Sequence, residues 1–239
     1  MNIQGLQKLT LLDYPGKVAC TVFLAGCNFR CPFCHNASLV THVDPGNDIP
    51  EQEVLEFLEK RAGVLDGVCI TGGEPLLSPE LETFIRKVRA MGYLVKLDTN
   101  GSSAGRLGSL MEKGLVDYVA MDIKNSPAKY AQTIGFDEYD LENIKESVKY
   151  LMEGGIPYEF RTTVVREFHK REDFEAIGQW LCGAENYYLQ GFVDSGDLIR
   201  PGLRGYTREI MEQALDIVKK YVPNAQLFWI TDLPIGAAF

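Results

Sequence analysis

The feature that most constrains the fold is a regular alternation of short apolar runs with amphipathic windows. The apolar runs have strand length and recur at intervals of about 25 to 35 residues, and helical spacing of apolar residues marks the windows between them. This alternation predicts βα units that share a parallel sheet. The predicted strands are 18–24, 67–71, 94–98, 118–123, 158–165 and 187–192, and a last run, 226–231, adds a terminal strand. The predicted helices are 51–61, 79–91, 104–113, 141–153, 172–182 and 207–221, and Ser78 before Pro79 is the predicted N-cap of the second.

Six βα units are fewer than the eight that close a full barrel. We therefore expect an open, partial (β/α)6 barrel of the TIM type, with a lateral gap between its first and last strands. With 239 residues, 46% of them hydrophobic, the chain can bury the core of one such scaffold. Because no low-complexity stretch or Gly/Ser-rich linker interrupts it, residues 1–239 are predicted to form a single domain.

Charge and cysteine usage narrow the classes of partner. A formal net charge of −9 with dispersed Lys and Arg disfavours a protein that binds nucleic-acid phosphates. No apolar run approaches the roughly 20 residues of a membrane helix, and the basic-then-apolar order of a signal peptide is absent, so we expect a cytoplasmic protein. Cys20, Cys69 and Cys182 lie far apart in apolar surroundings and are predicted to be buried, unpaired thiols.

Three other cysteines, Cys27, Cys31 and Cys34, lie close together in one short loop after the first predicted strand. A cubane iron–sulfur cluster normally takes four thiolates, one for each iron. Three thiols therefore predict a cluster with one iron left open for a substrate or cofactor. The alternatives are a zinc knuckle and a disulfide pair. Zinc commonly takes four ligands in two separated pairs, and His35 directly follows Cys34, which is a poor spacing for joint chelation.

Polar motifs follow the next predicted strands at the end where the loops of a parallel barrel converge. Gly72-Gly73-Glu74 follows the second strand and Asp98-Thr99-Asn100-Gly101 the third, while Asp122-Ile123-Lys124 ends the fourth and Arg161 lies in the fifth. The glycines allow close approach of a ligand to the backbone, and Glu74 adds an acceptor that suits an ammonium group. The alternatives are an ordinary strand-to-helix turn for the glycine pair and solvated charges for the aspartates.

The spacing Cys27-x-x-x-Cys31-x-x-Cys34, with Phe33 before the last cysteine, resembles the cluster loop of radical S-adenosylmethionine (SAM) enzymes. The stretch from Leu11-Leu-Asp-Tyr-Pro-Gly-Lys to Cys34-His35-Asn36 more narrowly resembles the activating enzymes of glycyl-radical proteins, above all those of anaerobic ribonucleoside-triphosphate reductases. The resemblance implies a 4Fe–4S cluster held by three cysteines, SAM as the ligand of the open iron, and reductive cleavage of SAM to methionine and a 5′-deoxyadenosyl radical. The radical would abstract hydrogen from a glycine Cα of a partner enzyme.

The resemblance also assigns contacts to individual residues. It implies that the Gly-Gly-Glu segment receives the methionyl amino group, that the backbone around the last cluster cysteine contacts adenine, and that two aspartates bind a monovalent cation beside the cofactor. Lys124 and Arg161 would neutralise the methionyl carboxylate or orient the ribose. The implied cofactor-binding residues are Phe33, His35, Gly72, Gly73, Glu74, Asp98, Asp122, Ile123, Lys124 and Arg161. The alternatives are a buried aromatic without a ligand for Phe33 and a solvent-facing imidazole for His35.

One difference between this chain and formate-lyase activators bears on the identity of the partner enzyme. Formate-lyase activators carry a cofactor-contacting histidine after their sixth strand, whereas this chain has Gln190-Gly-Phe-Val-Asp194 there, which favours the reductase branch. The segment 194–205 is rich in glycine, carries two arginines and is predicted to dock the partner, an ordinary surface loop being the alternative. A low-potential donor such as flavodoxin or ferredoxin would supply the electron. Competing hypotheses are a radical SAM enzyme that acts on a small molecule or peptide, an activase of formate lyase, and a non-catalytic cluster or zinc module.

Overall fold

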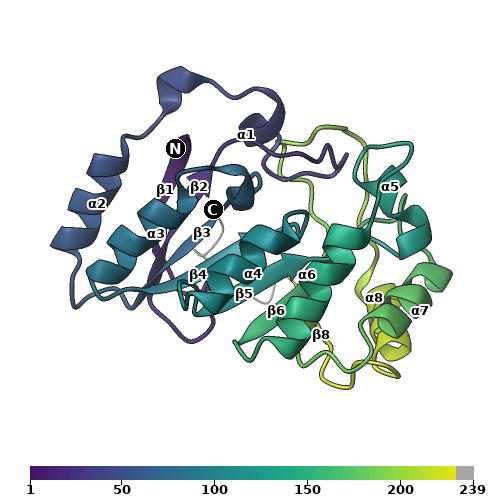
Figure 1. The fold of residues 1–239 in the computed structure, drawn as a ribbon. Coiled ribbons are helices and arrows are strands. Elements are labelled where there is room, and N and C mark those ends of the chain that lie inside the picture. Colours follow the sequence, from purple (N-terminus) through teal and green to yellow (C-terminus); the bar gives the residue numbers. More distant parts are fainter. Residues whose placement is uncertain (230–239) are drawn as a thin grey trace.

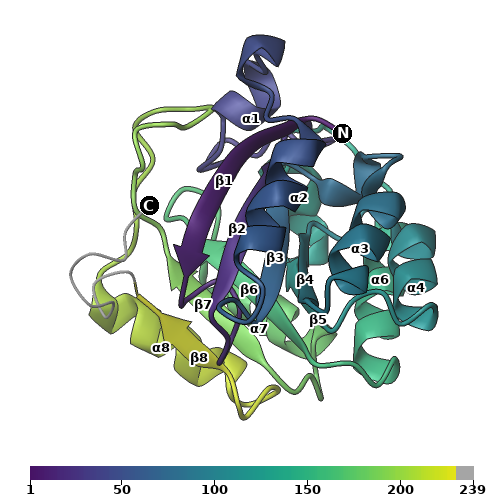
Figure 2. The ribbon, with the colours of Figure 1, turned by 90° about the vertical axis from the view of Figure 1, so that its left-hand side faces the viewer.

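A computed structural model describes residues 1–229 and shows one eight-stranded sheet with helices along its outer face (Figures 1 and 2). The strands are β1 Ile3–Thr10, β2 Ala19–Leu24, β3 Gly67–Gly72, β4 Leu94–Thr99, β5 Tyr118–Asp122, β6 Tyr158–Val164, β7 Tyr187–Gly191 and β8 Gln226–Phe228. The helices are α1 Ser38–Thr41, α2 Glu51–Lys60, α3 Leu81–Ala90, α4 Ala104–Glu112, α5 Tyr130–Thr133, α6 Glu142–Glu153, α7 Arg171–Trp180 and α8 Arg208–Val218.

The strand order follows the sequence, with β1 and β8 at the two edges of the sheet. Strands β2 to β8 are parallel to one another, and among residues 1–229 no pairing joins β1 to β8. The predicted partial barrel with six βα units is therefore confirmed. The predicted terminal strand is present as β8, although Ile230 and Thr231 of the predicted run lie outside the described residues.

Strand β1 was not predicted. It pairs antiparallel with β2 and forms the open edge of the sheet. Only Ile3 and Thr10 of its eight residues are buried, so the strand lacks the apolar run that marks the inner strands. Its pairing partner, and not its own hydrophobicity, makes this segment extended.

Helix α3 begins later than the Ser78-Pro79 pair predicted. Glu80 is its N-cap residue, and Leu81 its first helical residue. Ser78 instead closes a 3-10 turn over Pro75–Leu77, because its backbone N–H donates to the Pro75 carbonyl at 3.0 Å. The proline of the Gly-Gly-Glu-Pro segment thus sets a turn between β3 and the helix.

The two faces of the inner strands differ in chemistry because successive side chains of a strand point to opposite faces. In β4, Val95 and Leu97 are fully buried, whereas Lys96 and Asp98 on the other face join a polar network. The helices pack apolar stripes: α3 buries Leu81, Phe84, Ile85 and Val88. Each such side chain contributes about 1.5–3 kcal/mol. Figure 2 shows the helix layer beside the sheet. The polar side chains of the strands therefore lie on the inner face, which the helices do not cover.

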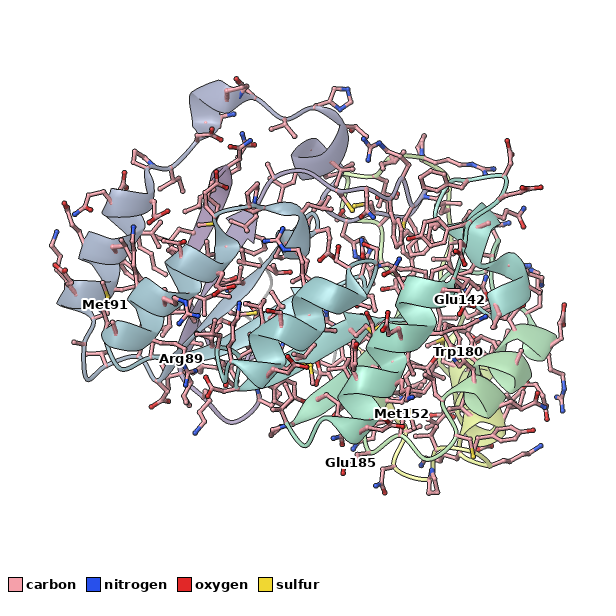
Figure 3. The ribbon with its side chains drawn as sticks, viewed as in Figure 1. Arg89, Met91, Glu142, Met152, Trp180 and Glu185 are labelled. Atoms are coloured by element: carbon pink, nitrogen blue, oxygen red, sulfur yellow. The ribbon has the colours of Figure 1, made fainter. Side chains whose placement is uncertain are left out.

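Arg89 and Glu185, which precede β4 and β7, lie in the lower half of the view in Figure 3, where the parallel strands begin. The carboxyl ends of the strands therefore meet at the opposite edge, near α1 (Figures 1 and 2). Among the described helices, none has the length and apolarity that crossing a lipid bilayer requires.

The isolated cysteines behave differently from one another. Cys20 and Cys69 are buried free thiols, as predicted. Cys182 is exposed, so its prediction was wrong; it lies beyond the last turn of α7, where Leu181 takes the buried position. Cys69 also departs from apolar surroundings, because its Sγ lies 3.7 Å from Asp98 Oδ1.

Candidate cluster and cofactor site

The cysteine loop follows β2 at the carboxyl edge of the sheet. Backbone bonds tie it to distant segments: Gly26 N donates to Leu39 O at 2.8 Å, and Arg30 N donates to Ile134 O at 2.9 Å. Within the loop, Cys34 N donates to Cys31 O at 3.0 Å and makes a tight turn. The three thiols are therefore held on a braced backbone.

The Gly72-Gly73 pair packs against the backbone of this loop. Gly73 N donates to Leu24 O, and Glu74 N donates to Gly26 O, both at 2.8 Å. A Cβ on Gly72 would lie 2.2 Å from Leu24 O, and one on Gly73 would lie 2.0 Å from Gly26 O. Gly72 also has a φ of +119°, which disfavours other residues. The glycines are thus required by contact with the cysteine loop, a reason that the sequence alone did not provide.

Glu74 joins the ends of β3 and β4. Its Oε1 accepts from Leu76 N at 3.1 Å and from Thr99 Oγ1 at 2.7 Å, and its Oε2 accepts from Asn100 N at 2.6 Å. Burial raises the pKa of Glu74 to about 7, although these donors oppose the rise. Because three donors already use its oxygens, the predicted contact with an ammonium group would have to compete with them and stays a prediction.

Asn100 is a site residue that the sequence reasoning missed. Its Nδ2 lies 3.7 Å from Cys27 Sγ and 3.0 Å from Asn28 Oδ1, and the side chain is 5% exposed. Asn28 in turn donates to Ser102 Oγ at 2.9 Å. In the sequence, Asn100-Gly101 reads as a turn signal; its place directly after a strand that ends at the carboxyl edge was the available clue.

Five charged side chains alternate across the inner face of β4, β5 and β6. Lys96 Nζ donates to Asp98 Oδ1, and Arg161 bridges Asp98 Oδ2 at 2.9 Å and Asp122 Oδ1 at 3.1 Å. Lys124 Nζ then donates to Asp122 Oδ2 at 2.8 Å. Although burial opposes the change, Lys124 and Arg161 lower the pKa of Asp122 to about 2. Four of the predicted residues therefore come together, and Lys96, which was not predicted, joins them.

The predicted monovalent cation does not fit this arrangement. All four carboxylate oxygens of Asp98 and Asp122 already accept from Lys96, Arg161 or Lys124. The alternative of solvated charges does not describe Asp98, whose side chain is 12% exposed, whereas 31% of the Asp122 side chain is exposed. Ile123, between Asp122 and Lys124, is fully buried. Its N–H donates to Arg161 O at 2.8 Å and its carbonyl accepts from Thr162 Oγ1 at 2.7 Å, so its contact with the cofactor stays a prediction.

The two aromatic residues of the loop have different surroundings. Phe33 is 4% exposed and packs on Phe168 with ring centroids 5.6 Å apart, so its side chain belongs to the core. The His35 imidazole stacks on Phe192 at 5.3 Å with an interplanar angle of 15°, and is not solvent-facing. Of the buried side-chain nitrogen and oxygen atoms in the described part of the chain, His35 Nε2 alone has no hydrogen-bond partner. A polar cofactor atom would satisfy it.

The predicted docking segment 194–205 lies along the cysteine loop, beside α1 in Figure 2. Asp197 accepts from Ser38 Oγ at 2.7 Å and from Ser38 N at 3.1 Å. Arg200 N donates to Pro32 O at 2.9 Å. The segment is thus anchored to the loop, while Val193 to Gly196 are exposed.

The donor set fits a cubane cluster. Burial raises the pKa of Cys31 to about 12 and raises the pKa of Cys27 and of Cys34, while the Lys124 cation opposes the rise at all three. Buried thiolates are therefore unfavourable unless metal ions compensate them. Among residues 1–229, no three His, Cys, Asp or Glu side chains converge on a point where one metal ion could bind. A cubane has its irons at separate corners, so its ligands need no common point.

Comparison with known proteins identifies the family. The family model described as the radical SAM superfamily matches residues 21–181. The chain belongs to the radical SAM superfamily. Radical SAM enzymes use a 4Fe–4S cluster and SAM, so the resemblance to this superfamily and these two predicted cofactors are confirmed.

Radical SAM relatives match the chain over different lengths. A Methanocaldococcus jannaschii protein, named as a candidate glycyl-radical enzyme activating enzyme, is 31% identical over 230 residues, 93% of each chain. The pyruvate formate-lyase-activating enzyme of Clostridium pasteurianum is 31% identical over 129 residues, 52% of each chain. Streptococcus suis SuiB bound to SAM shares the fold, with a TM-score of 0.66 and 14% identity over 87% of this chain and 51% of SuiB.

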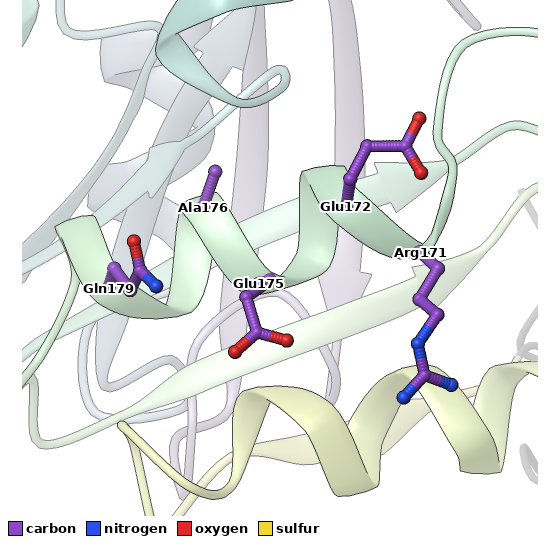
Figure 4. A pocket seen from close by; sticks show the side chains of 5 residues that line it. All are labelled: Arg171, Glu172, Glu175, Ala176 and Gln179. Carbon is purple, nitrogen blue, oxygen red and sulfur yellow. The ribbon is translucent and has the colours of Figure 1, made fainter.

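A surface depression elsewhere on this radical SAM fold lies over α7 (Figure 4). It is lined by Arg171, Glu172, Glu175, Ala176 and Gln179. All five belong to one helix of the outer layer and none belongs to the cysteine loop. The depression therefore adds no residue to the site.

Proposed function

We propose that the chain is an activating enzyme that installs a glycyl radical on a partner protein, and that this partner is an anaerobic ribonucleoside-triphosphate reductase. The observation that carries the proposal is the similarity to the Methanocaldococcus jannaschii protein, which extends over 93% of both chains. An alignment of this extent includes the cysteine loop and every motif of the inner face. Cytoplasmic location, where low-potential donors such as flavodoxin or ferredoxin reduce the cluster, is part of the same proposal.

The cysteine loop and the Gly72-Gly73 segment have different roles in this proposal. Cys27, Cys31 and Cys34 would hold a 4Fe–4S cluster and leave one iron open for the cofactor. Bound together, a 4Fe–4S cluster and SAM supply reductive cleavage to methionine and a 5′-deoxyadenosyl radical. The Gly72-Gly73 backbone lies against the cysteine loop, where it would receive the methionyl amino group.

Other side chains orient the rest of the cofactor. Lys124 contributes positive charge beside the three thiols, which suits the methionyl carboxylate. His35 Nε2 is buried without a partner next to the Phe192 ring, which suits a polar edge of adenine or ribose. We assign the ring of Phe33 to packing and leave its backbone for the cofactor.

A glycine Cα–H is a suitable target because no side chain blocks approach and the radical is delocalised over the adjoining amides. The open edge between β1 and β8 and the segment 194–205 provide the route for a glycine loop of the partner. Close positioning is needed, because a primary radical reacts with any C–H within reach.

The choice of partner depends on the end of β7. The segment Gln190-Gly-Phe-Val-Asp194 lies where formate-lyase activators have a histidine, and Gln190 Oε1 accepts from Thr163 Oγ1 at 3.4 Å. This difference from formate-lyase activators favours an anaerobic ribonucleoside-triphosphate reductase as the partner enzyme. Activation of a formate lyase is the second candidate, supported by the similarity to the Clostridium pasteurianum enzyme.

The test mixes the cluster-loaded, reduced protein and SAM with an anaerobic reductase or with a formate lyase. Electron paramagnetic resonance then detects the glycyl doublet. A doublet on the reductase alone supports the proposal, and a doublet on formate lyase alone supports the second candidate. Cleavage of SAM with no doublet on either protein would indicate a small-molecule or peptide substrate.

A further inference from the structure

Lys96 is an unusual residue for the interior of a strand. It lies in the middle of β4, and its side chain is 1% exposed. Lysine is almost never fully buried unless an anion pairs with it. Here Nζ donates to Asp98 Oδ1, lies 4.0 Å from Cys69 Sγ, and lies 5.9 Å from the centroid of the Tyr118 ring. Asp98, Cys69 and Tyr118 therefore surround the ammonium group of Lys96.

This ammonium lies where two carboxylates would otherwise repel each other. Asp98 and Asp122 interact unfavourably as like charges, and Arg161 bridges them from β6. Without Lys96, Asp98 Oδ1 would lose its charged partner and face only the Cys69 thiol. Exposed carboxylate oxygen in a buried site is the ligand that Na⁺ or K⁺ would bind.

The charges of the network balance when Lys96 is present. The cations are Lys96, Arg161 and Lys124, and the carboxylates are Asp98, Asp122 and Glu159, which lies 3.8 Å from Arg161 Nη1. Although burial opposes it, Asp98 raises the pKa of Lys96, which keeps the side chain protonated. An added metal ion beside Asp98 and Asp122 would find each carboxylate oxygen already accepting a hydrogen bond from a cation, and no uncompensated charge.

We propose that the Lys96 ammonium is a built-in cation, which takes the place of a bound monovalent metal ion beside Asp98 and Asp122 and makes the SAM site independent of Na⁺ and K⁺. Lys96 acts as a positioning residue, because it reaches the cofactor only through Asp98 and Arg161. The part of this inference that concerns SAM affinity rests on the proposed function. The part that concerns the ion does not, since it is a property of the folded chain.

The experiment replaces Lys96 by methionine, which keeps most of the volume and removes the charge. Cluster-loaded full-length protein is melted while tetramethylammonium chloride is exchanged for KCl, NaCl or NH₄Cl at constant ionic strength. Lys96→Arg keeps the charge. Lys87→Met removes an exposed lysine that pairs with Glu51 at 2.7 Å and is the matched control.

The wild type, Lys96→Arg and Lys87→Met should melt at the same temperature in all four salts, to within about 1 °C. Lys96→Met should gain a saturable rise of roughly 2 to 4 °C with K⁺, Na⁺ or NH₄⁺. Its affinity for SAM, measured by calorimetry, should fall about tenfold in tetramethylammonium and recover with the small cation.

A saturable, ion-specific shift in the wild type would overturn the proposal, as would a folded Lys96→Met variant that gains none. If Lys96→Met does not fold, the wild type and Lys96→Arg decide the question, because flat titrations of both support the built-in cation. Melting requires neither SAM nor a partner protein. Failure to form a glycyl radical would therefore count against the proposed function alone.

Discussion

Asn100 places its side-chain amide 3.7 Å from the sulfur of Cys27, across the loops that follow β4 and β2. The Glu74 carboxylate accepts from the backbone N–H of Asn100, and Asn28 Oδ1 accepts from the side-chain Nδ2 of Asn100. A residue at the end of a strand thus contacts a ligand of the proposed cluster. Hydrogen bonds to cluster sulfurs are one determinant of cluster potential.

Replacement of Asn100 by alanine should make the cluster harder to reduce, because the amide stabilises negative charge on the Cys27 sulfur. A bond of this kind corresponds to a potential shift of roughly 20–60 mV. A redox titration followed by electron paramagnetic resonance measures it. Asn143→Ala, on the exposed face of α6, is the control. Equal potentials in both variants would show that the amide does not act on the cluster.

Replacement of Gly73 by alanine should disrupt the contact between the Gly-Gly-Glu segment and the cysteine loop. The added Cβ would lie 2.0 Å from Gly26 O, which only a backbone shift can relieve. We expect a loss of roughly 2 to 4 kcal/mol in the free energy of unfolding, together with weaker SAM binding. Gly105 in α4 has no atom within 4 Å of an added Cβ. Gly105→Ala should therefore be neutral or stabilise by about 0.5–1 kcal/mol. Urea unfolding of both variants checks the pair, and similar losses would refute the packing argument.

Glu74 should make stability depend on pH. Its pKa in the folded chain, about 7, lies above the ordinary value of 4.5, so the folded state binds more protons between these two values. Its contribution is therefore fully present below pH 4.5 and is lost as pH rises through 7. Relative to Glu74→Gln, the wild type should lose up to about 3 kcal/mol over this interval. Urea unfolding at a series of pH values measures the difference, with the exposed Glu53→Gln as control. A constant difference between wild type and Glu74→Gln would contradict this.

Asp197 should affect the partner more than the cofactor. Asp197→Ala removes the hydrogen bonds that Ser38 N and Ser38 Oγ donate to the carboxylate, and loosens the segment 194–205. Glycyl-radical formation should fall about three- to tenfold, while partner-free cleavage of SAM changes less. Asp194→Ala is the matched control, because the Asp194 carboxylate bonds within its own segment, to Gly196 N. Equal loss in both assays would mean that the segment serves only the cluster loop.

The cysteine loop and the six βα units were predictable because both leave local signals: fixed spacing of thiols, and apolar periodicity. Strand β1 was not, because only two of its residues are buried and its pairing with β2 makes it extended. Strand ends in the sequence predicted that four charged residues lie at the site, namely Asp98, Asp122, Lys124 and Arg161. Their pairing with one another could not be predicted, because it depends on the register of three strands. Lys96 and Asn100 could not be predicted as site residues from the sequence. A lysine within a strand and an Asn-Gly turn are common in proteins, and only the tertiary neighbours of these two residues indicate a role.

The central claim is that Cys27, Cys31 and Cys34 hold a cluster with one open iron that serves SAM. The most direct measurement is the yield of 5′-deoxyadenosine from anaerobically reconstituted, reduced protein with SAM, scaled to bound iron. The wild type and Cys182→Ser, which changes an exposed thiol outside the loop, should form it equally, whereas Cys31→Ser should form none. Wild-type protein that binds four irons per chain and yet makes no 5′-deoxyadenosine would contradict the account.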